Sequence, residues 1–158
     1  MLKLIPMAQD IYDAYMENLL KDYSQEHVKT GNWKPEEAME RAREQVLQLL
    51  PDGPQSENQY LYSLRDDEIG ENVGVLWFAV QEHGNKPEAF IYDIVIYETY
   101  RRQGYASSAL DAMEAKVLEL GIHKISLHVF GHNSPAISLY EKIGFSPTNI
   151  LMSKELED

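Results

Sequence analysis

The sequence has no cysteine among its 158 residues. This absence excludes disulfide bonds, thiolate ligands to a metal and any mechanism that passes through an acyl-cysteine intermediate. No apolar run approaches the ~20 residues that a membrane-spanning helix needs. The N-terminal stretch MLKLIPMAQD also becomes polar too soon for a signal peptide. Together these absences predict a cytoplasmic protein that does not act in a membrane.

Basic residues are scarce as well: 14 lysines and arginines stand against 26 acidic residues, which gives a net charge of −12. A surface of this sign repels nucleic acid, so the composition argues against a nucleic-acid partner. The acidity favours two interpretations, simple solubility or the attraction of a cationic substrate such as an amine. Repeats and low-complexity linkers are absent too, and 44% of the residues are apolar, so we expect a single domain over residues 1–158.

The first part of the chain has the patterns of two helices and three strands. Apolar spacing predicts a helix over residues 10–29 and a second helix that begins at Pro35 and ends before the stretch PDGP at residues 51–54. Three apolar segments with short connections follow, at residues 59–65, 72–80 and 89–96. Short connections favour an antiparallel meander. Gly74 indicates either a bulge or a close approach of a neighbouring backbone.

The second part alternates between helix and strand patterns. It predicts, in order, a helix over residues 106–120, a strand over 124–130, a helix over 135–143 and a closing strand over 145–156. Asn133 or Ser134 would cap the shorter helix, and Gly144 would end it. A strand, a helix and a strand in succession should leave the two strands parallel. The fold class is therefore α/β, a mixed and mostly antiparallel sheet with about four helices on its faces.

Residues 101–106, RRQGYA, lie between a predicted strand and a predicted helix. Gly104 and Ala106 are small, and the amides that follow open a helix, where backbone N–H groups are unpaired and the helix dipole is positive. Arg101 and Arg102 add positive charge. The motif predicts a pyrophosphate cradle or, alternatively, an exposed basic cap. It is neither a Walker loop nor a dinucleotide fingerprint, because Gly-Lys-Ser/Thr and G-x-G-x-x-G are both absent.

A second motif, NSPAISLYEKIGF at residues 133–145, stands downstream of the first. With this pair of motifs at this spacing, the sequence resembles the GNAT superfamily of N-acetyltransferases, and most of all its uncharacterised bacterial members. The resemblance covers roughly residues 73–156. It implies an acetyl-CoA co-substrate, a sheet whose parallel pair is splayed, an acceptor side built by residues 1–58, and an acetyl-CoA-binding core over residues 59–158.

The resemblance also implies roles for individual residues. The backbone of β-strand residues 94–96 would pair with the pantetheine arm and donate to the oxyanion. Amides of residues 103–106, with both arginines, would bind the pyrophosphate. Asn133 would reach the pantetheine or the acceptor side, although its alternative role is to cap the helix. The implied cofactor-binding residues are Ile94, Val95, Ile96, Arg101, Arg102, Gln103, Gly104, Tyr105, Ala106, Asn133, Ala136 and Tyr140.

The catalytic residues that we expect are Tyr140, Asp93 and Asn133. In the resemblance Tyr140 stands beside the sulfur, where a phenol can protonate a departing thiolate; its alternative role is core packing. Asp93 on the predicted strand is the first candidate for the general base, because partial burial would raise the pKa of its carboxyl. The other candidates for the base are His128, His132, Glu98 and a water chain.

The sequence therefore predicts an enzyme that transfers an acetyl group from acetyl-CoA directly to a primary amine of a small molecule or a peptide. An alternative is a non-catalytic module that binds acyl-CoA, and a weaker one is a nucleotide-binding protein. No metal is predicted, because His123, His128 and His132 lack neighbouring acidic ligands at a suitable spacing. A strand near the C-terminus could pair across the axis of a homodimer.

Overall fold

The computed structural model describes residues 2–157, apart from the side chain of His83. The described chain forms two compact units that divide between Leu127 and His128, and each is described separately below. The single domain over residues 1–158 remains a prediction.

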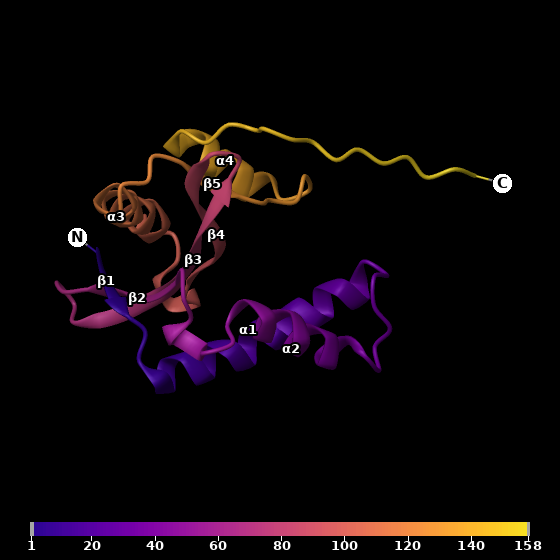
Figure 1. Ribbon diagram of the computed structural model, residues 1–158, viewed down its shortest axis with the longest axis horizontal. Coiled ribbons are helices and arrows are strands. Elements are labelled where there is room, and N and C mark those ends of the chain that lie inside the picture. Colours follow the sequence, from indigo (N-terminus) through magenta and orange to yellow (C-terminus); the bar gives the residue numbers. More distant parts are fainter. Residues whose placement is uncertain (1, 158) are drawn as a thin grey trace. The chain divides into compact units, whose positions relative to one another are not determined.

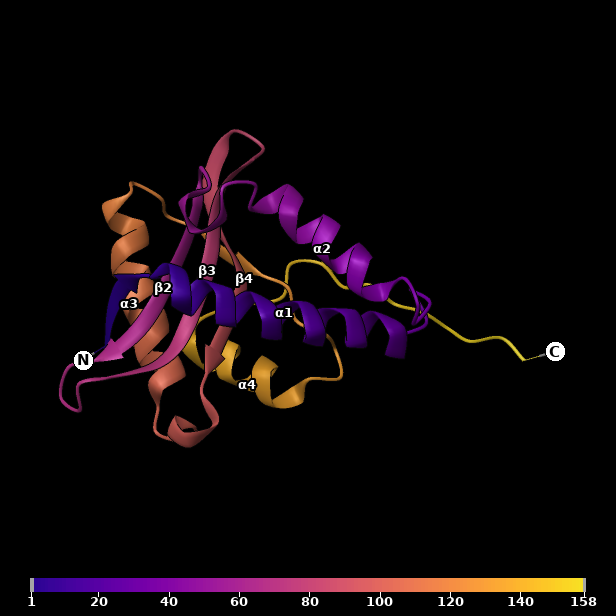
Figure 2. The same cartoon turned by 90° about the horizontal axis from the view of Figure 1, so that it is seen from below.

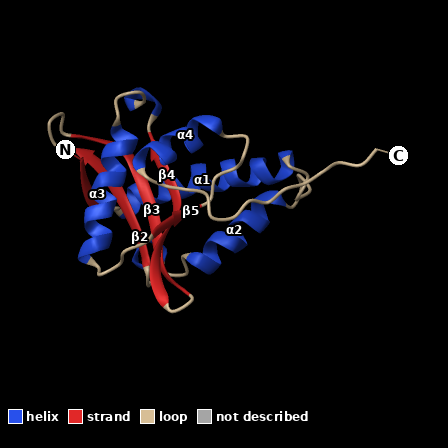
Figure 3. Ribbon diagram, turned by 90° about the horizontal axis from the view of Figure 1, so that it is seen from above, coloured by secondary structure: helices blue, strands red, loops and turns tan. Residues whose placement is uncertain are grey.

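The first unit is built around one five-stranded sheet in the order β1-β2-β3-β4-β5. The strands are β1 (Leu2–Pro6), β2 (Gln59–Asp66), β3 (Glu71–His83), β4 (Lys86–Ile96) and β5 (Ile125–Leu127). Neighbours from β1 to β4 are antiparallel, and β4 and β5 are parallel. Figure 3 shows the long strands β2, β3 and β4 side by side. The predicted fold class, a mixed and mostly antiparallel sheet with one parallel pair, is confirmed.

Helices cover both faces of this sheet. On one face lie α1 (Gln9–Lys29) and α2 (Ala38–Leu49), and on the other lies α3 (Tyr105–Glu119) (Figure 1). Tyr15 of α1 belongs to a buried cluster with Leu61 of β2 and Trp77 of β3. The far ends of α1 and α2 project beyond the sheet (Figure 2), and there Trp33 packs against the helices' own side chains. Two short 3₁₀ helices, η1 (Gly53–Gln55) and η2 (Glu98–Tyr100), complete the unit.

The second unit contains α4 (Ser134–Ile143), which begins one residue before the predicted start and ends at the predicted residue. Asn133 is the N-cap: its Oδ1 accepts a hydrogen bond from the amide of Ala136 at 3.3 Å. Gly144 ends the helix with a φ of 117°. The closing strand predicted over residues 145–156 is wrong, because this segment pairs with no strand within the described chain. An apolar strand pattern shows that a segment can pair in a sheet, but it does not show whether a partner strand lies beside it.

Other element boundaries also differ from the expectation. The sequence missed β1, which pairs with β2 and buries Leu2. Residues 81–88, predicted as a short connection between two strands, are almost all strand, because Gly84 takes a φ of 67° and allows a tight hairpin. The second helix begins at Ala38 rather than Pro35, after a turn. The strand predicted over residues 124–130 narrows to the three residues of β5.

Two bulges shape the centre of the sheet. Trp77 pairs with Asp93 while Phe78 pairs with Ile91, so Tyr92 is an extra residue in β4. In the same way, Leu64 pairs with Gly74 while Arg65 pairs with Asn72, so Val73 is an extra residue in β3. Both predictions for Gly74 are confirmed. The bulge lies directly beside it, and a neighbouring backbone approaches closely, because a Cβ there would lie 2.0 Å from the carbonyl oxygen of Val95. Glycine thus lets β3 and β4 approach closely beside the bulge.

Candidate active site

Asp93 lies on β4, immediately after the bulge, and faces α1. The hydroxyl of Tyr15 donates a hydrogen bond of 2.7 Å to its Oδ2. Burial raises the pKa of Asp93, and nearby Asp22 adds to this shift, while hydrogen bonds from Tyr15 and from the amide of Ile94 oppose it. Tyr15 is 8% exposed, and burial raises its own pKa well above the usual value. Tyr15 therefore stays protonated and acts as the donor.

The bulge explains why Asp93 faces α1. Paired residues of neighbouring strands share a face, so Asp93 lies on the face of Trp77, whereas Ile91 lies on the opposite face with Phe78. Without the extra residue, Ile91 and Asp93 would share one face. Val95 packs against the same cluster as Trp77, so Asp93 and Val95 lie on one face, in agreement with the alternation of a strand.

Aromatic side chains cluster on the part of the sheet that carries Asp93, which is paired with Trp77. Tyr92 stacks on Trp77 with ring centroids 4.7 Å apart, and Phe90 meets Tyr92 edge-on at 5.2 Å. Trp77 is held in place, because its Nε1 donates to Gln59 Oε1 at 2.7 Å. Tyr92 remains 36% exposed. An accessible ring next to a carboxylate is a suitable surface for a cation.

Beyond the bulge, β4 continues without β5. The parallel pairing covers Ala89–Ile91 of β4 and stops at the pair Ile91 and Leu127. Ile94, Val95 and Ile96 remain paired with β3 on their other side. This part of β4 therefore has one edge that β5 does not occupy, which is the arrangement expected of a splayed parallel pair.

The segment from β4 to α3 carries the motif RRQGYA. The amide of Tyr97 donates to Val73 O at 2.8 Å, and Arg101 Nε donates to Ile96 O at 3.0 Å. Arg102 and Gly104 both have positive φ, 66° and 79°. Gly104 is the N-cap of α3. These contacts bring the arginines and the first turn of α3 to the end of β4.

The first turn of α3 presents unpaired donors. The amides of residues 103–107 donate to no acceptor within residues 2–157. Apart from Gly104 and its two chain neighbours, no atom of that part of the chain lies within 4 Å of the place where a side chain on Gly104 would begin. Arg101, Arg102 and Gln103 are exposed, and Tyr105 and Ala106 are half-buried. Open space, free amides and two guanidinium groups together suit an anion.

Tyr105 has a second contact that the sequence did not predict. Its hydroxyl donates to Asp66 Oδ2, with the two oxygens 2.5 Å apart. This hydrogen bond raises the pKa of Tyr105 to about 12 and, more than any other contact, lowers the pKa of Asp66. The first turn of α3 is thus joined to the end of β2.

The second unit carries the remaining predicted residues. Tyr140 is half-buried on α4, and its ring meets Phe145 edge-on at 5.7 Å. Ala136 donates its amide to the Asn133 cap. His128 and His132 both lie against Phe130. In the first unit, Glu98 is exposed on η2.

Tyr15 and Asp66 are the partners that sequence reasoning missed. Tyr15 and Asp93 stand 78 residues apart, and Asp66 and Tyr105 stand 39 apart. No local pattern marks either pair. Within residues 2–157 no group of three His, Asp or Glu side chains is placed to hold a metal ion. In that same part of the chain no helix is both long and apolar enough to cross a membrane.

Comparison with known proteins identifies the family. The sequence model of the acetyltransferase (GNAT) family matches residues 9–145. The chain belongs to this family. YycN of Bacillus subtilis strain 168, an uncharacterised N-acetyltransferase, is 41% identical over 97% of each chain. YdgE of the same organism, also an uncharacterised N-acetyltransferase, is 33% identical over 95% of each chain.

Solved structures with a similar fold agree with this assignment. The crystal structure of YycN matches this fold with a TM-score of 0.89, at 40% identity, over 100% of both chains. The structure of AAC(6′)-Iy with a CoA bisubstrate analogue matches with a TM-score of 0.62 over 100% of this chain and 99% of that one. At 15% identity this second likeness shows the fold alone. The protein is therefore an acetyltransferase with the GNAT fold, as the two motifs predicted.

Proposed function

We propose that this acetyltransferase uses acetyl-CoA to acetylate a primary amine by direct transfer. The observation that carries the proposal is Asp93, a half-buried carboxylate of raised pKa at the start of the strand edge that β5 leaves unpaired. The chain has no cysteine, which agrees with transfer that forms no acyl-cysteine intermediate.

The residues present suit acetyl-CoA as the donor. The amides of Gln103 and Gly104 precede α3 and those of Tyr105 and Ala106 open it, none with an acceptor in the described chain, and Arg101 and Arg102 stand beside them. Such a helix end binds a pyrophosphate through its N–H groups and its positive dipole. When bound, acetyl-CoA supplies an acetyl thioester as well as this anion.

The free edge of β4 provides the second part of the donor site. Ile94, Val95 and Ile96 lie beyond the last residue that β5 pairs. A pantetheine arm carries amides that can bond to such an edge in the manner of an added strand. A backbone N–H in this segment would also donate to the oxyanion that develops when an amine attacks the thioester carbonyl.

Asp93 is the proposed general base. A primary amine is mostly protonated near neutral pH and must lose a proton before it can attack. A carboxylate whose pKa is raised by burial accepts that proton more readily than an exposed one. Tyr15 holds the carboxylate in place through its hydrogen bond. Tyr92, exposed on Trp77, offers a ring on which the cationic acceptor can rest.

Tyr140 is the proposed general acid, which donates its phenolic proton to the departing sulfur. Its position in the motif NSPAISLYEKIGF supports this role. Asn133 caps α4 through Oδ1, and its side-chain amide would contact the pantetheine or the acceptor. The ligand of AAC(6′)-Iy, CoA-S-monomethyl-acetylneamine, supports an amine as the kind of acceptor. A small molecule and a peptide both fit this description.

The test measures thiol release from acetyl-CoA with a panel of small amines and peptides, for the unmodified chain and three variants. Asp93→Asn keeps an oxygen that can accept from Tyr15 but removes the base, so kcat/KM should fall about 100-fold or more. Tyr140→Phe should lower kcat by a similar order while the fold is kept. Asp111→Asn, an exposed carboxylate on α3, is the matched control and should have no effect.

Stability separates a catalytic role from a structural one. Burial disfavours the charged carboxylate of Asp93, so Asp93→Asn should leave Tm at neutral pH unchanged or raised. An Asp93→Asn variant that is folded and retains full kcat/KM would remove Asp93 as the base. Full activity of Tyr140→Phe would remove the proposed acid. Failure of the unmodified chain to bind acetyl-CoA would overturn the donor.

A further inference from the structure

The pairing of Tyr105 with Asp66 has no part in the chemistry proposed above, yet it connects two elements of the first unit. Asp66 is the last residue of β2 and is only 6% exposed. Tyr105 is the first residue of α3. The bond between them therefore ties the beginning of the anion-binding helix to the end of a central strand.

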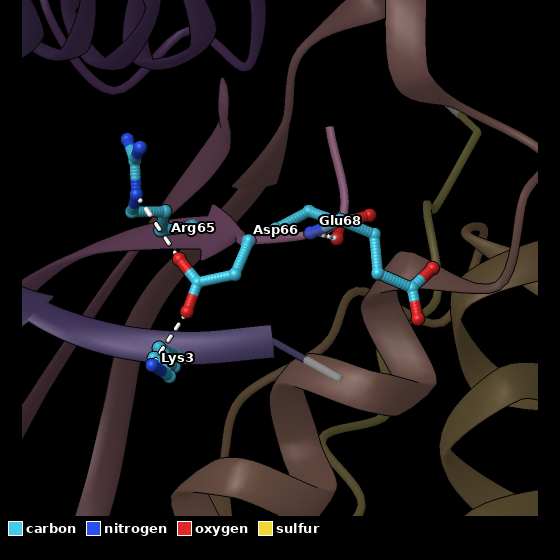
Figure 4. A network of polar contacts seen from close by, with 5 residues as sticks. Lys3, Arg65, Asp66 and Glu68 are labelled. Atoms are coloured by element: carbon cyan, nitrogen blue, oxygen red, sulfur yellow. Dashed lines mark hydrogen bonds and ion pairs between the residues drawn. The ribbon is translucent and has the colours of Figure 1, made fainter. Parts of the chain in front are cut away.

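Asp66 is itself held firmly. Its Oδ1 accepts the amide of Glu68 at 2.9 Å, and its backbone carbonyl accepts the amide of Gly70 at 2.8 Å. Figure 4 shows Asp66 at the end of β2 and Glu68 in the turn that follows, with Lys3 and Arg65 nearby. Lys3 and Arg65 are paired on adjacent strands, and both form ion pairs with Asp67. The acceptor for Tyr105 thus lies at the end of β2, next to a turn that is fixed to two strands.

The segment that leads to α3 has two attachments elsewhere. The Tyr97 amide bonds to Val73 O on β3, and Arg101 Nε bonds to Ile96 O at the end of β4. Arg102 and Gly104, which follow Arg101, both have positive φ. The amides of residues 103–107 donate no hydrogen bond to the described chain. Among the hydrogen bonds of residues 2–157, Tyr105 provides the next side-chain attachment after Arg101.

We propose that Tyr105 is a positioning residue whose hydroxyl, bonded to Asp66, holds the first turn of α3 in the geometry that binds the pyrophosphate of acetyl-CoA. This inference rests on the proposed function. Besides the two arginines, the donors proposed for the anion are backbone amides, whose N–H groups remain when a side chain is replaced by any residue but proline. Their direction depends on the first turn, and a small displacement weakens several hydrogen bonds at once. The side chain of Tyr105 therefore acts on affinity without touching the ligand.

The test compares Tyr105→Phe with Tyr100→Phe. Tyr100 lies edge-on to Tyr105 at 6.3 Å, and its hydroxyl makes no hydrogen bond within residues 2–157, so its substitution controls for the loss of a phenol near the loop. Tyr105→Phe should raise the KM and the Kd for acetyl-CoA about three- to tenfold. The kcat and the KM for the acceptor should stay unchanged, because the chemistry is untouched.

A second pair of variants tests the acceptor. Asp66→Asn retains an oxygen for the Tyr105 hydroxyl and should preserve most of the affinity, whereas Asp66→Ala should reproduce the loss. Combining Asp66→Ala with Tyr105→Phe should cost no more affinity than either change alone, because both remove one bond. Hydrogen exchange of the first-turn amides of α3, measured without ligand, should be faster in Tyr105→Phe than in Tyr100→Phe.

The outcomes are distinguishable. The unmodified chain is measured first, and its failure to bind acetyl-CoA would overturn the proposed function before any variant is made. If the unmodified chain binds, a Kd for acetyl-CoA that is equal in Tyr105→Phe and Tyr100→Phe would overturn the positioning role. This includes the case in which both variants lose affinity equally, since such a loss would reflect the aromatic neighbourhood rather than the bond to Asp66.

Discussion

Replacing Gly74 by alanine should damage both the sheet and the donor site, because of one close contact. A Cβ at this position would lie 2.0 Å from the carbonyl oxygen of Val95 and 3.1 Å from Cα of Ile96. Ordinary van der Waals contact begins at 3.4 Å, so the Val95 oxygen must move away by a further 1.4 Å. Both atoms belong to the backbone of the last two residues of β4, which are paired with β3, and no side-chain rotation can relieve the clash.

The expected loss of stability follows from this geometry. Forcing extra atoms into a packed interior costs about 1–3 kcal/mol, and a clash with backbone belongs at the upper end. For a chain of this length each kcal/mol lowers Tm by about 2–4 °C, so Gly74→Ala should lower Tm by roughly 6–12 °C. Val95 also lies on the strand edge that we propose for pantetheine, so the affinity for acetyl-CoA should fall as well.

Thermal unfolding followed by circular dichroism measures the first effect, and calorimetric titration with acetyl-CoA measures the second. Gly131→Ala is the matched control, since within the described residues a Cβ there has no atom within 4 Å and φ is not positive. It should change the free energy of unfolding by less than about 0.5 kcal/mol. A Tm for Gly74→Ala within 2 °C (about 1 kcal/mol) of the unmodified chain would refute the close-approach argument.

Two further predictions concern Asp93 and the charge of the whole chain. Tyr15→Phe removes a hydrogen bond that lowers the pKa of Asp93, so this pKa should rise. The acidic limb of the profile of kcat/KM against pH should then move to higher pH. If the limb does not move, Asp93 is not the group whose protonation limits catalysis. If the net charge of −12 attracts a cationic acceptor, kcat/KM for that acceptor should fall steeply between low and 0.5 M salt, because exposed charges are screened over about 10 Å at 0.1 M. A flat response would assign the acidity to solubility alone.

The features that the sequence predicted correctly depend on local patterns. The apolar spacing from Ala106 to Leu120 gave α3 to within one residue, because helix periodicity is repeated many times along this segment. Asn133 and Gly144 marked the ends of α4 through cap chemistry that involves only neighbouring residues. The two family motifs are also local, and they identified the family correctly.

The features that the sequence missed depend on partners far along the chain. Leu2 and Leu4 alternate around Lys3, yet so short a pattern does not predict β1 without its neighbour β2. Residues 145–156 have a strand's composition but no partner in the described chain. The bonds from Tyr15 to Asp93 and from Tyr105 to Asp66 form only when distant elements meet. The sequence could name Asp93 as a candidate base but not the tyrosine that orients it.

The bulge at Tyr92 links the fold to the proposed chemistry more closely than any motif does. One extra residue reverses the alternation of β4, which brings Asp93 to the face of Trp77 and Tyr15. A bulge also bends its strand, and the pairing with β5 ends at Ile91, the residue before it. The same irregularity thus buries the proposed base and adjoins the part of β4 that β5 does not pair, where we propose that the donor binds. Deleting Tyr92 should return Asp93 to the opposite face, so it should abolish activity even where the chain still folds.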